Sequence, residues 1–82
     1  MFAPGDIIIC YDGVGVVLAN NKYLIISGSD GPSRYQVKNE FSLPDHAALM
    51  TEPQINALNY EVKFALRFAS LSQQDRLTSY NM

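Results

Sequence analysis

The chain has 82 residues and a mass of 9.1 kDa, which is the size of a single domain with one modest hydrophobic core. Apolar residues make up 48% of it and charged residues 17%, a composition typical of globular rather than disordered chains. The net charge is −2, from six basic and eight acidic side chains that are scattered along the sequence. This balance argues against a nucleic-acid-binding protein, which normally carries a basic stripe.

We expect a cytoplasmic protein without a membrane-spanning segment. The sequence contains no apolar run of about eighteen residues, the length that a transmembrane helix needs. Residues 1–6 have neither the basic nor the apolar segment of a signal peptide. The single cysteine, Cys10, cannot form an internal disulfide, which fits a reducing compartment.

The first half of the chain is expected to form five short strands separated by turns. Asn20 and Asn21 tolerate the left-handed conformation of a tight hairpin, and residues 28–32 form a turn cluster rich in glycine and proline. Gly15 lies inside the second strand and indicates a bulge or a sharp bend. The predicted strands are residues 7–11, 14–19, 23–27, 33–38 and 40–43.

Short strands joined by tight turns favour a small SH3-like barrel over residues 4–43. A lone hairpin is marginally stable in water, and closing the sheet removes its exposed edges. We expect residues 45–50 to form a short helical turn after the barrel.

Residues 52–70 are predicted to form an amphipathic helix. Thr51 as N-cap and Gln54 three residues later are typical of a capping box at its start. Its first apolar stripe recurs every three or four residues and consists of Ile55, Leu58, Val62, Ala65 and Ala69. A second stripe, which is either further core or an interface, consists of Tyr60, Phe64, Phe68 and Leu71.

The prediction for residues 1–82 is therefore one α+β domain, a five-stranded SH3/Tudor-like barrel followed by a C-terminal amphipathic helix. Residues 72–82 are polar and are expected to form a frayed tail.

No residue pattern in the chain predicts catalysis, a metal site or a bound cofactor. The chain has one histidine and one cysteine, and the ligand spacings of zinc sites are absent from its sequence. His46 follows Asp45, but no nucleophile motif accompanies the pair, so we interpret His46 as a surface loop side chain. Cys10 lies among isoleucines and is expected to be a buried structural residue. We therefore predict that the protein is not an enzyme.

Residues 4–17, with the sequence Pro-Gly-Asp-Ile-Ile-Ile-Cys-Tyr-Asp-Gly-Val-Gly-Val-Val, resemble the opening of small Tudor/SH3-like barrels in transcription proteins. Such barrels are the RNA-polymerase-interaction domains of CarD-type regulators and transcription-repair coupling factors. KOW domains of NusG-type factors share the Gly-Asp opening, the first strand and the turn glycine, and the Tudor modules of UvrD-type helicases look similar. The resemblance covers residues 4–43, with Asp12 in place of the histidine that is usual in the CarD-like pattern.

The resemblance implies a transcription-associated protein-binding module that docks on the RNA polymerase β subunit, partly by pairing with an edge strand. In this sequence the candidate edge strand is Arg34-Tyr35-Gln36-Val37-Lys38. Its backbone would pair with the partner while its side chains set specificity. Arg34 and Lys38 fit a second role equally well, as charges that protect an edge strand from aggregation.

Two other functions stay open at this point. One is a small adaptor or inhibitor, of viral origin for example, that blocks a host protein through the edge strand or through one side of the helix. That side of the helix, formed by Tyr60, Phe64 and Phe68, is also a candidate homodimer interface. The other is a KOW-like nucleic-acid or ribosome-associated barrel, in which Tyr23, Tyr35 and Tyr60 would stack on bases. The near-neutral charge argues against this second function.

Overall fold

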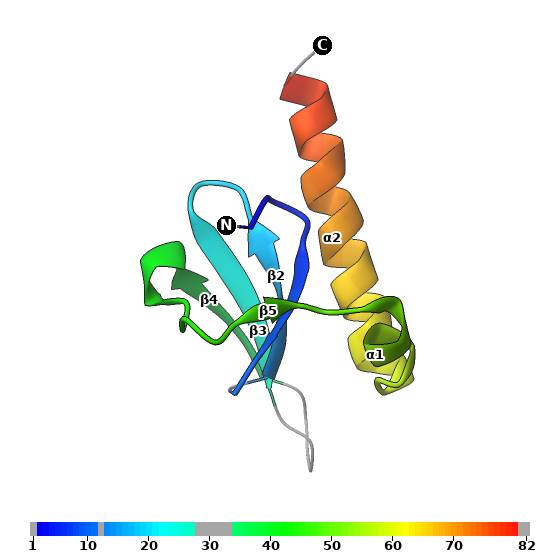
Figure 1. The fold of residues 1–82 in the computed structure, drawn as a ribbon. Helices are drawn as coiled ribbons and strands as arrows, with labels where there is room; N and C mark the ends of the chain where they lie inside the picture. Colours follow the sequence, from blue (N-terminus) through cyan, green and yellow to red (C-terminus); the bar gives the residue numbers. More distant parts are fainter. Residues whose placement is uncertain (1, 12, 28–33, 81–82) are drawn as a thin grey trace.

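A five-stranded antiparallel sheet with a long helix on one of its faces makes up most of the structure (Figure 1). The computed structural model describes residues 2–11, 13–27 and 34–80, with side chains as far as Gln73. The predicted turn at residues 28–32 lies outside these ranges. The elements are β1 (Ile7–Cys10), β2 (Gly13–Leu18), β3 (Lys22–Ser27), β4 (Arg34–Asn39), the 3-10 helix η1 (Glu40–Ser42), β5 (Ala48–Leu49), α1 (Glu52–Asn56) and α2 (Tyr60–Tyr80).

The strand order of the sheet is β4-β3-β2-β1-β5. The first four strands follow one another as a meander, and β5 returns to pair with β1 through Ile8↔Leu49 and Ile9↔Ala48. Within the described residues β4 and β5 are the two edges and do not pair with each other, so the sheet is not closed. The α+β class is confirmed, and the SH3-like barrel over residues 4–43 stays a prediction.

The hairpin between β2 and β3 has the backbone conformation that its sequence predicts. Asn20 and Asn21 both have positive φ angles, 65° and 60°. Asparagine is one of the few residues that adopt this left-handed region at low cost, because its side chain forms local hydrogen bonds. The Asn-Asn pair therefore fixes the register of the two central strands.

The fifth strand lies elsewhere in the chain than predicted. Residues 40–43, expected as a strand, contain η1, which is closed by a 2.9 Å hydrogen bond from the Leu43 N–H to the Glu40 carbonyl oxygen. The fifth strand is Ala48–Leu49, inside the segment 45–50 that was expected to form a helical turn. The expected strand at 40–43 was wrong because a four-residue segment has too little periodicity to distinguish a strand from a tight turn. The turn expected in 45–50 covers only its beginning, where the Ala47 N–H donates to the Pro44 carbonyl oxygen at 3.0 Å.

Gly15 has a role different from the predicted bulge. The register runs without an extra residue through Gly15↔Ile25 on one side and Ile8↔Gly15 on the other. A Cβ atom built on Gly15 would overlap the Leu24 carbonyl oxygen of β3. Glycine is therefore required because the backbones of β2 and β3 approach each other closely at this point.

The two faces of the sheet bury separate apolar clusters. The face under α2, called here the helix face, holds Val14, Val16 and Ile26 against Leu66 of α2. The opposite face holds Ile8, Val17, Tyr23 and Ile25, with Phe2, Cys10 and Leu43 packed at its margin. Cys10 is only half-buried there, so the expected fully buried cysteine is a marginal one.

The predicted helix over residues 52–70 is two helices. The capping box is confirmed, since the Thr51 N–H donates to Gln54 Oε1 at 2.8 Å and the Gln54 N–H donates to Thr51 Oγ1. However, α1 ends at Asn56, and α2 begins after Asn59, whose Oδ1 atom accepts a 2.8 Å hydrogen bond from the Glu61 N–H. α2 then continues to Tyr80, where a frayed tail was expected from residue 72.

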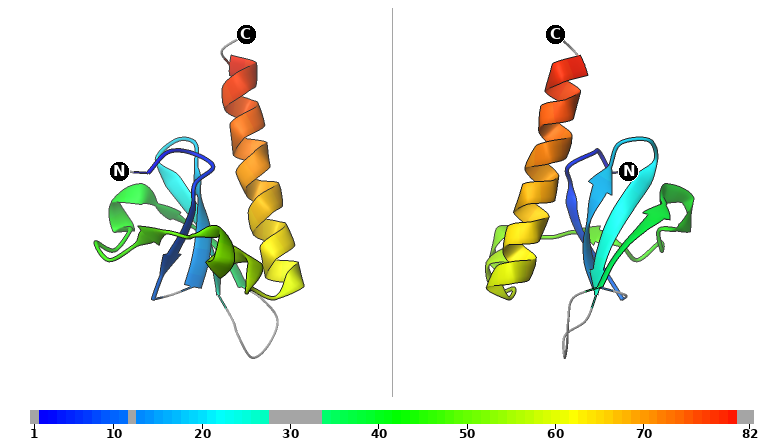
Figure 2. Two further views of the ribbon diagram at one scale, coloured as in Figure 1. Left: turned by 45° about the vertical axis from the view of Figure 1, so that its right-hand side comes forward. Right: turned by 180° about the vertical axis from the view of Figure 1, so that it is seen from behind.

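Two hydrogen bonds from buried side chains fix α2 on the sheet. The Ser70 hydroxyl donates to the Gly5 carbonyl oxygen at 2.5 Å, and the Ala19 N–H donates to Gln73 Oε1 at 2.9 Å. These bonds join the helix to the segment before β1 and to the β2–β3 hairpin. Beyond them the backbone of α2 extends past the sheet, as all three ribbon views show (Figures 1 and 2).

Candidate protein-binding surfaces

The first predicted surface, residues 34–38, lies on the long edge strand of the sheet. β4 has six residues, whereas the opposite edge strand, β5, has two. Its side chains at positions 34–37 are all exposed, including the apolar Tyr35 at 59% and Val37 at 54%. The structure therefore places apolar side chains in solvent along the edge that has more backbone length to offer a partner.

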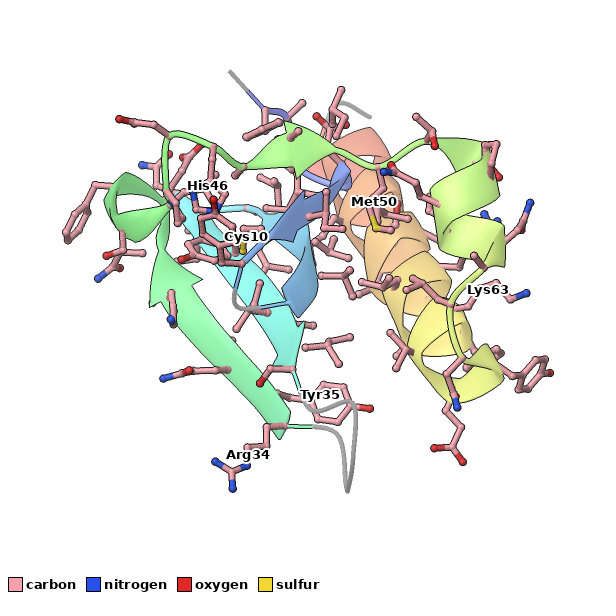
Figure 3. The ribbon with its side chains drawn as sticks, turned by 60° about the horizontal axis from the view of Figure 1, so that its bottom comes forward. Cys10, Arg34, Tyr35, His46, Met50 and Lys63 are labelled. Atoms are coloured by element: carbon pink, nitrogen blue, oxygen red, sulfur yellow. The ribbon has the colours of Figure 1, made fainter. Side chains whose placement is uncertain are left out.

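The two sides of β4 differ in chemistry. Tyr35 is paired with Ile26, and Val37 with Leu24, which puts both apolar side chains on the helix face of the sheet. Arg34, Gln36 and Lys38 alternate with them and belong to the opposite face. Figure 3 shows Tyr35 directed to the side where α2 lies and Arg34 directed away from it.

The second predicted surface, the aromatic stripe of α2, lies on the side of the helix that points away from the sheet. Its members are between 59% and 76% exposed, whereas Leu66 on the other side of the helix is 0% exposed. The stripe consists of Tyr60, Phe64, Phe68 and Leu71. The interpretation of this stripe as further core is therefore wrong for the folded chain. The stripe and the exposed apolar side chains of β4 belong to separate elements, and no contact between them is among those described.

The three tyrosines considered as a base-stacking platform do not share a surface. Tyr23 is buried in the cluster on the face opposite α2, whereas Tyr35 and Tyr60 are exposed on β4 and α2. A stacking platform needs side chains that present their rings to one strand of nucleic acid. The predicted set of three cannot do this.

Two basic residues of α2, Lys63 and Arg67, lie at the flank of the aromatic stripe. Arg67 Nη2 is 3.1 Å from Glu52 Oε2 and 3.3 Å from Asn56 Oδ1, so it connects α2 to α1. Lys63, one turn earlier, is half-buried. The ion pair with Glu52 offsets the charge of Arg67, so Lys63 and Arg67 do not form a strongly basic patch.

His46 makes a structural contact that the sequence did not indicate. The Tyr11 N–H donates to His46 Nε2 at 3.1 Å, and the two rings lie with centroids 3.9 Å apart. This contact holds the segment between η1 and β5 against the end of β1, close to Cys10 (Figure 3). Because Nε2 accepts a hydrogen bond, the imidazole serves here as an acceptor that positions a loop.

Ser70 and Gln73 are further residues whose roles sequence reasoning missed. Both residues continue, at helical spacing, the apolar side of α2 that packs on the sheet. Both are buried, whereas serine and glutamine side chains are usually exposed. Their partners, the backbone groups of Gly5 and Ala19, are distant in sequence. Only the folded topology brings these groups together.

Within residues 2–11, 13–27 and 34–80, no three histidine, cysteine or acidic side chains lie close enough to hold a metal ion. Neither α1 nor α2, as described, combines the length and apolar character needed to cross a membrane. Comparisons of the chain with protein-family models, with curated proteins and with solved structures found no match. The arrangement of exposed side chains on β4 and α2 is therefore the basis on which a function is inferred.

Proposed function

We propose that the chain is a non-enzymatic protein-interaction module that binds an extended segment of a partner protein along β4. The observation that carries this proposal is the exposure of Tyr35 and Val37 on the longer edge strand of the sheet. An edge strand offers backbone N–H and C=O groups that can pair with a further strand. Long edges with exposed apolar side chains invite aggregation unless a partner covers them.

The alternation on β4 specifies what kind of segment fits. A strand added to β4 would place every second side chain next to Tyr35 and Val37, which favours apolar residues at those positions. The intervening side chains would lie on the face of Arg34, whose positive charge favours acidic residues. The proposed ligand is therefore an extended segment in which apolar and acidic residues alternate.

The proposal includes a partly open SH3/Tudor-like barrel for residues 4–43. In its support, the chain passes from one edge strand of the sheet, β4, through η1 to the other edge strand, β5. Both faces of the sheet carry a buried cluster. This is expected of a sheet that curves around a core on one face and is covered by a helix on the other face. The resemblance of residues 4–17 to CarD-type domains makes the RNA polymerase β subunit the first partner to test.

The test is affinity capture with the tagged full-length chain from extracts of its source cell or host, at low and high salt, with and without nuclease. We expect recovery of a protein partner that survives nuclease treatment. The variant Y35S/V37S should reduce this recovery at least about tenfold, because it removes the apolar contacts of the added strand. The matched control is Phe41→Ser, which removes an even more exposed apolar side chain from η1 instead of β4.

Each outcome of this capture has a separate meaning. RNA polymerase β among the recovered proteins supports the transcription-associated function, whereas a different single protein supports the adaptor or inhibitor. Recovery that is lost with nuclease and falls steeply with salt supports the KOW-like nucleic-acid function. If Y35S/V37S recovers the partner as well as the natural chain does, β4 is not the binding site.

A further inference from the structure

The outer face of α2 carries an apolar stripe that the fold itself does not use. Tyr60, Phe64, Phe68 and Leu71 recur at intervals of four, four and three residues, which places them on one side of the helix. All four are exposed, while Leu66 on the opposite side is completely buried. The sheet already occupies the other side of α2, and none of the residues in 2–11, 13–27 and 34–80 covers the stripe, so a partner has to be sought for it.

The stripe is an ordered ridge of substantial area. The Phe64 and Phe68 rings are stacked, with centroids 6.4 Å apart and an interplanar angle of 18°. At about 200 Å² for each large aromatic side chain, the exposed fractions correspond to roughly 500 Å² of apolar surface. Apolar patches of this size on a single chain are commonly binding sites.

We propose that this stripe pairs with the same stripe of a second copy of the chain, with the two α2 helices antiparallel. The argument rests first on the spacing, which is almost symmetric about residue 66. In an antiparallel pair centred there, Phe64 faces the second copy's Phe68, and Tyr60 faces the second copy's Leu71. A two-fold interface requires this kind of self-complementarity, in which each residue finds its partner at the mirrored position.

The charges beside the stripe also permit this pairing. Arg67 is held by Glu52 and Asn56 of its own chain, so it does not bring a free positive charge to the interface. The two Lys63 side chains are offset by six residues along the helix axes, which is about 9 Å at the rise of an α-helix. That separation is about one Debye length at physiological salt, so their repulsion is weak.

The area of the stripe is sufficient for a dimer. Two copies of the stripe together would bury roughly 1,000 Å² of apolar surface, about the lower limit for a specific protein–protein interface. The stems of the flanking Lys63 and Glu61 add to this area. An interface of this size predicts a reversible dimer that dissociates on dilution, in which each copy keeps its β4 strand exposed. This inference is separate from the function proposed for β4, and either can fail without the other.

The test is the mass of the full chain in solution, measured by sedimentation equilibrium over a series from low micromolar to submillimolar concentration. We expect a shift toward twice the 9.1 kDa of one chain as concentration rises. The variant F64S/F68S should raise the dissociation constant at least about a hundredfold, because each dimer loses four aromatic rings. Y35S/V37S and Phe41→Ser are controls that should dimerise like the natural chain.

Two results would overturn the inference. One is a mass of 9.1 kDa for the natural chain at every concentration. The other is a folded F64S/F68S variant that dimerises as well as the natural chain, which would place the interface elsewhere. A measurement without substitution decides the matter if that variant unfolds. In a mixture of labelled and unlabelled chains, antiparallel pairing predicts intermolecular nuclear Overhauser effects between Phe64 and Phe68, and a parallel pair would give Phe64–Phe64 contacts instead.

Discussion

The two sides of α2 are both apolar, yet only one of them is core. The side on the sheet consists mainly of small and aliphatic residues, with Ala65 and Ala69 beside Leu66. The outer side has the larger side chains, among them Phe64 and Phe68. The β-branched side chains of β1 and β2 already fill the space above the sheet, so a close-packed helix must approach with small residues. The size of an apolar stripe therefore does not show whether it is buried in the fold.

Truncation of one large residue on each side of α2 tests which side is core, and it should give the largest difference in stability. Leu66→Ala should lower the free energy of unfolding by about 3 kcal/mol, because it opens a cavity at a completely buried position. Phe64→Ala, two residues away, should change it by less than about 0.5 kcal/mol, since the ring is mostly in solvent and alanine favours the helix. Urea unfolding, followed by circular dichroism at concentrations where the chain is monomeric, measures both values.

The opposite result for this pair would reverse the assignment of the two sides. If Phe64→Ala costs as much as Leu66→Ala in the monomer, the aromatic stripe belongs to the core of the single chain, and the proposed pairing of two α2 helices is wrong. A cost that appears for Phe64→Ala only at high concentration supports the pairing, because dimerisation then contributes to stability.

Much of the sheet could be predicted from the sequence because local signals mark its first four strands. Runs of β-branched residues and the Asn20-Asn21 turn give their positions to within one or two residues. β5 could not be predicted, since a two-residue strand has no periodicity and exists only through its pairing with β1. The division of the helix at residues 57–59 had a signal, Asn59 as an N-cap, that the continuous apolar spacing concealed.

The residues of both candidate surfaces could be predicted from the sequence, but the sequence did not show which of them are exposed in the fold. The alternation of polar and apolar residues predicted a half-exposed strand at β4, and its position at the edge of the sheet comes from the structure. For α2, two apolar stripes on one helix left the core and the exposed side undecided, because periodicity gives relative and not absolute orientation. Which side meets the sheet depends on volumes in β1 and β2 and on the hydrogen bonds of Ser70 and Gln73, all of which are tertiary facts.

A smaller effect is expected from the polar contact that orients the inner side of α2. Gln73→Ala removes the acceptor of the Ala19 N–H and should lower the free energy of unfolding by about 1–2 kcal/mol. It should also speed hydrogen exchange of the Ala19 amide selectively, which a general loss of packing would not do. The matched control is Leu71→Ala on the outer side, which should leave this amide unchanged. Equal exchange of the Ala19 amide in Gln73→Ala and the natural chain would show that this hydrogen bond does not orient the helix.

The smallest effect is expected at the flank between the two sides, where Arg67 joins α2 to α1. The two partners of this ion pair, Arg67 and Glu52, have side-chain exposures of 42% and 70%, so water reaches both. Such pairs contribute little because water and salt screen them and two long side chains must be ordered. In a double-mutant cycle of Arg67→Ala and Glu52→Ala, the coupling in the free energy of unfolding should be about 0.5 kcal/mol, and it should be smaller in high salt.

The same cycle also tests why this flank does not oppose self-pairing. If the Glu52 pair neutralises Arg67, Glu52→Ala should weaken the dimer at low salt, because it exposes a positive charge beside the stripe of each copy. Arg67→Ala should not weaken it. A Glu52→Ala chain that dimerises like the natural one at low salt would mean that the charges of this flank lie too far from the second copy to matter. The antiparallel register centred on residue 66 would then have to shift.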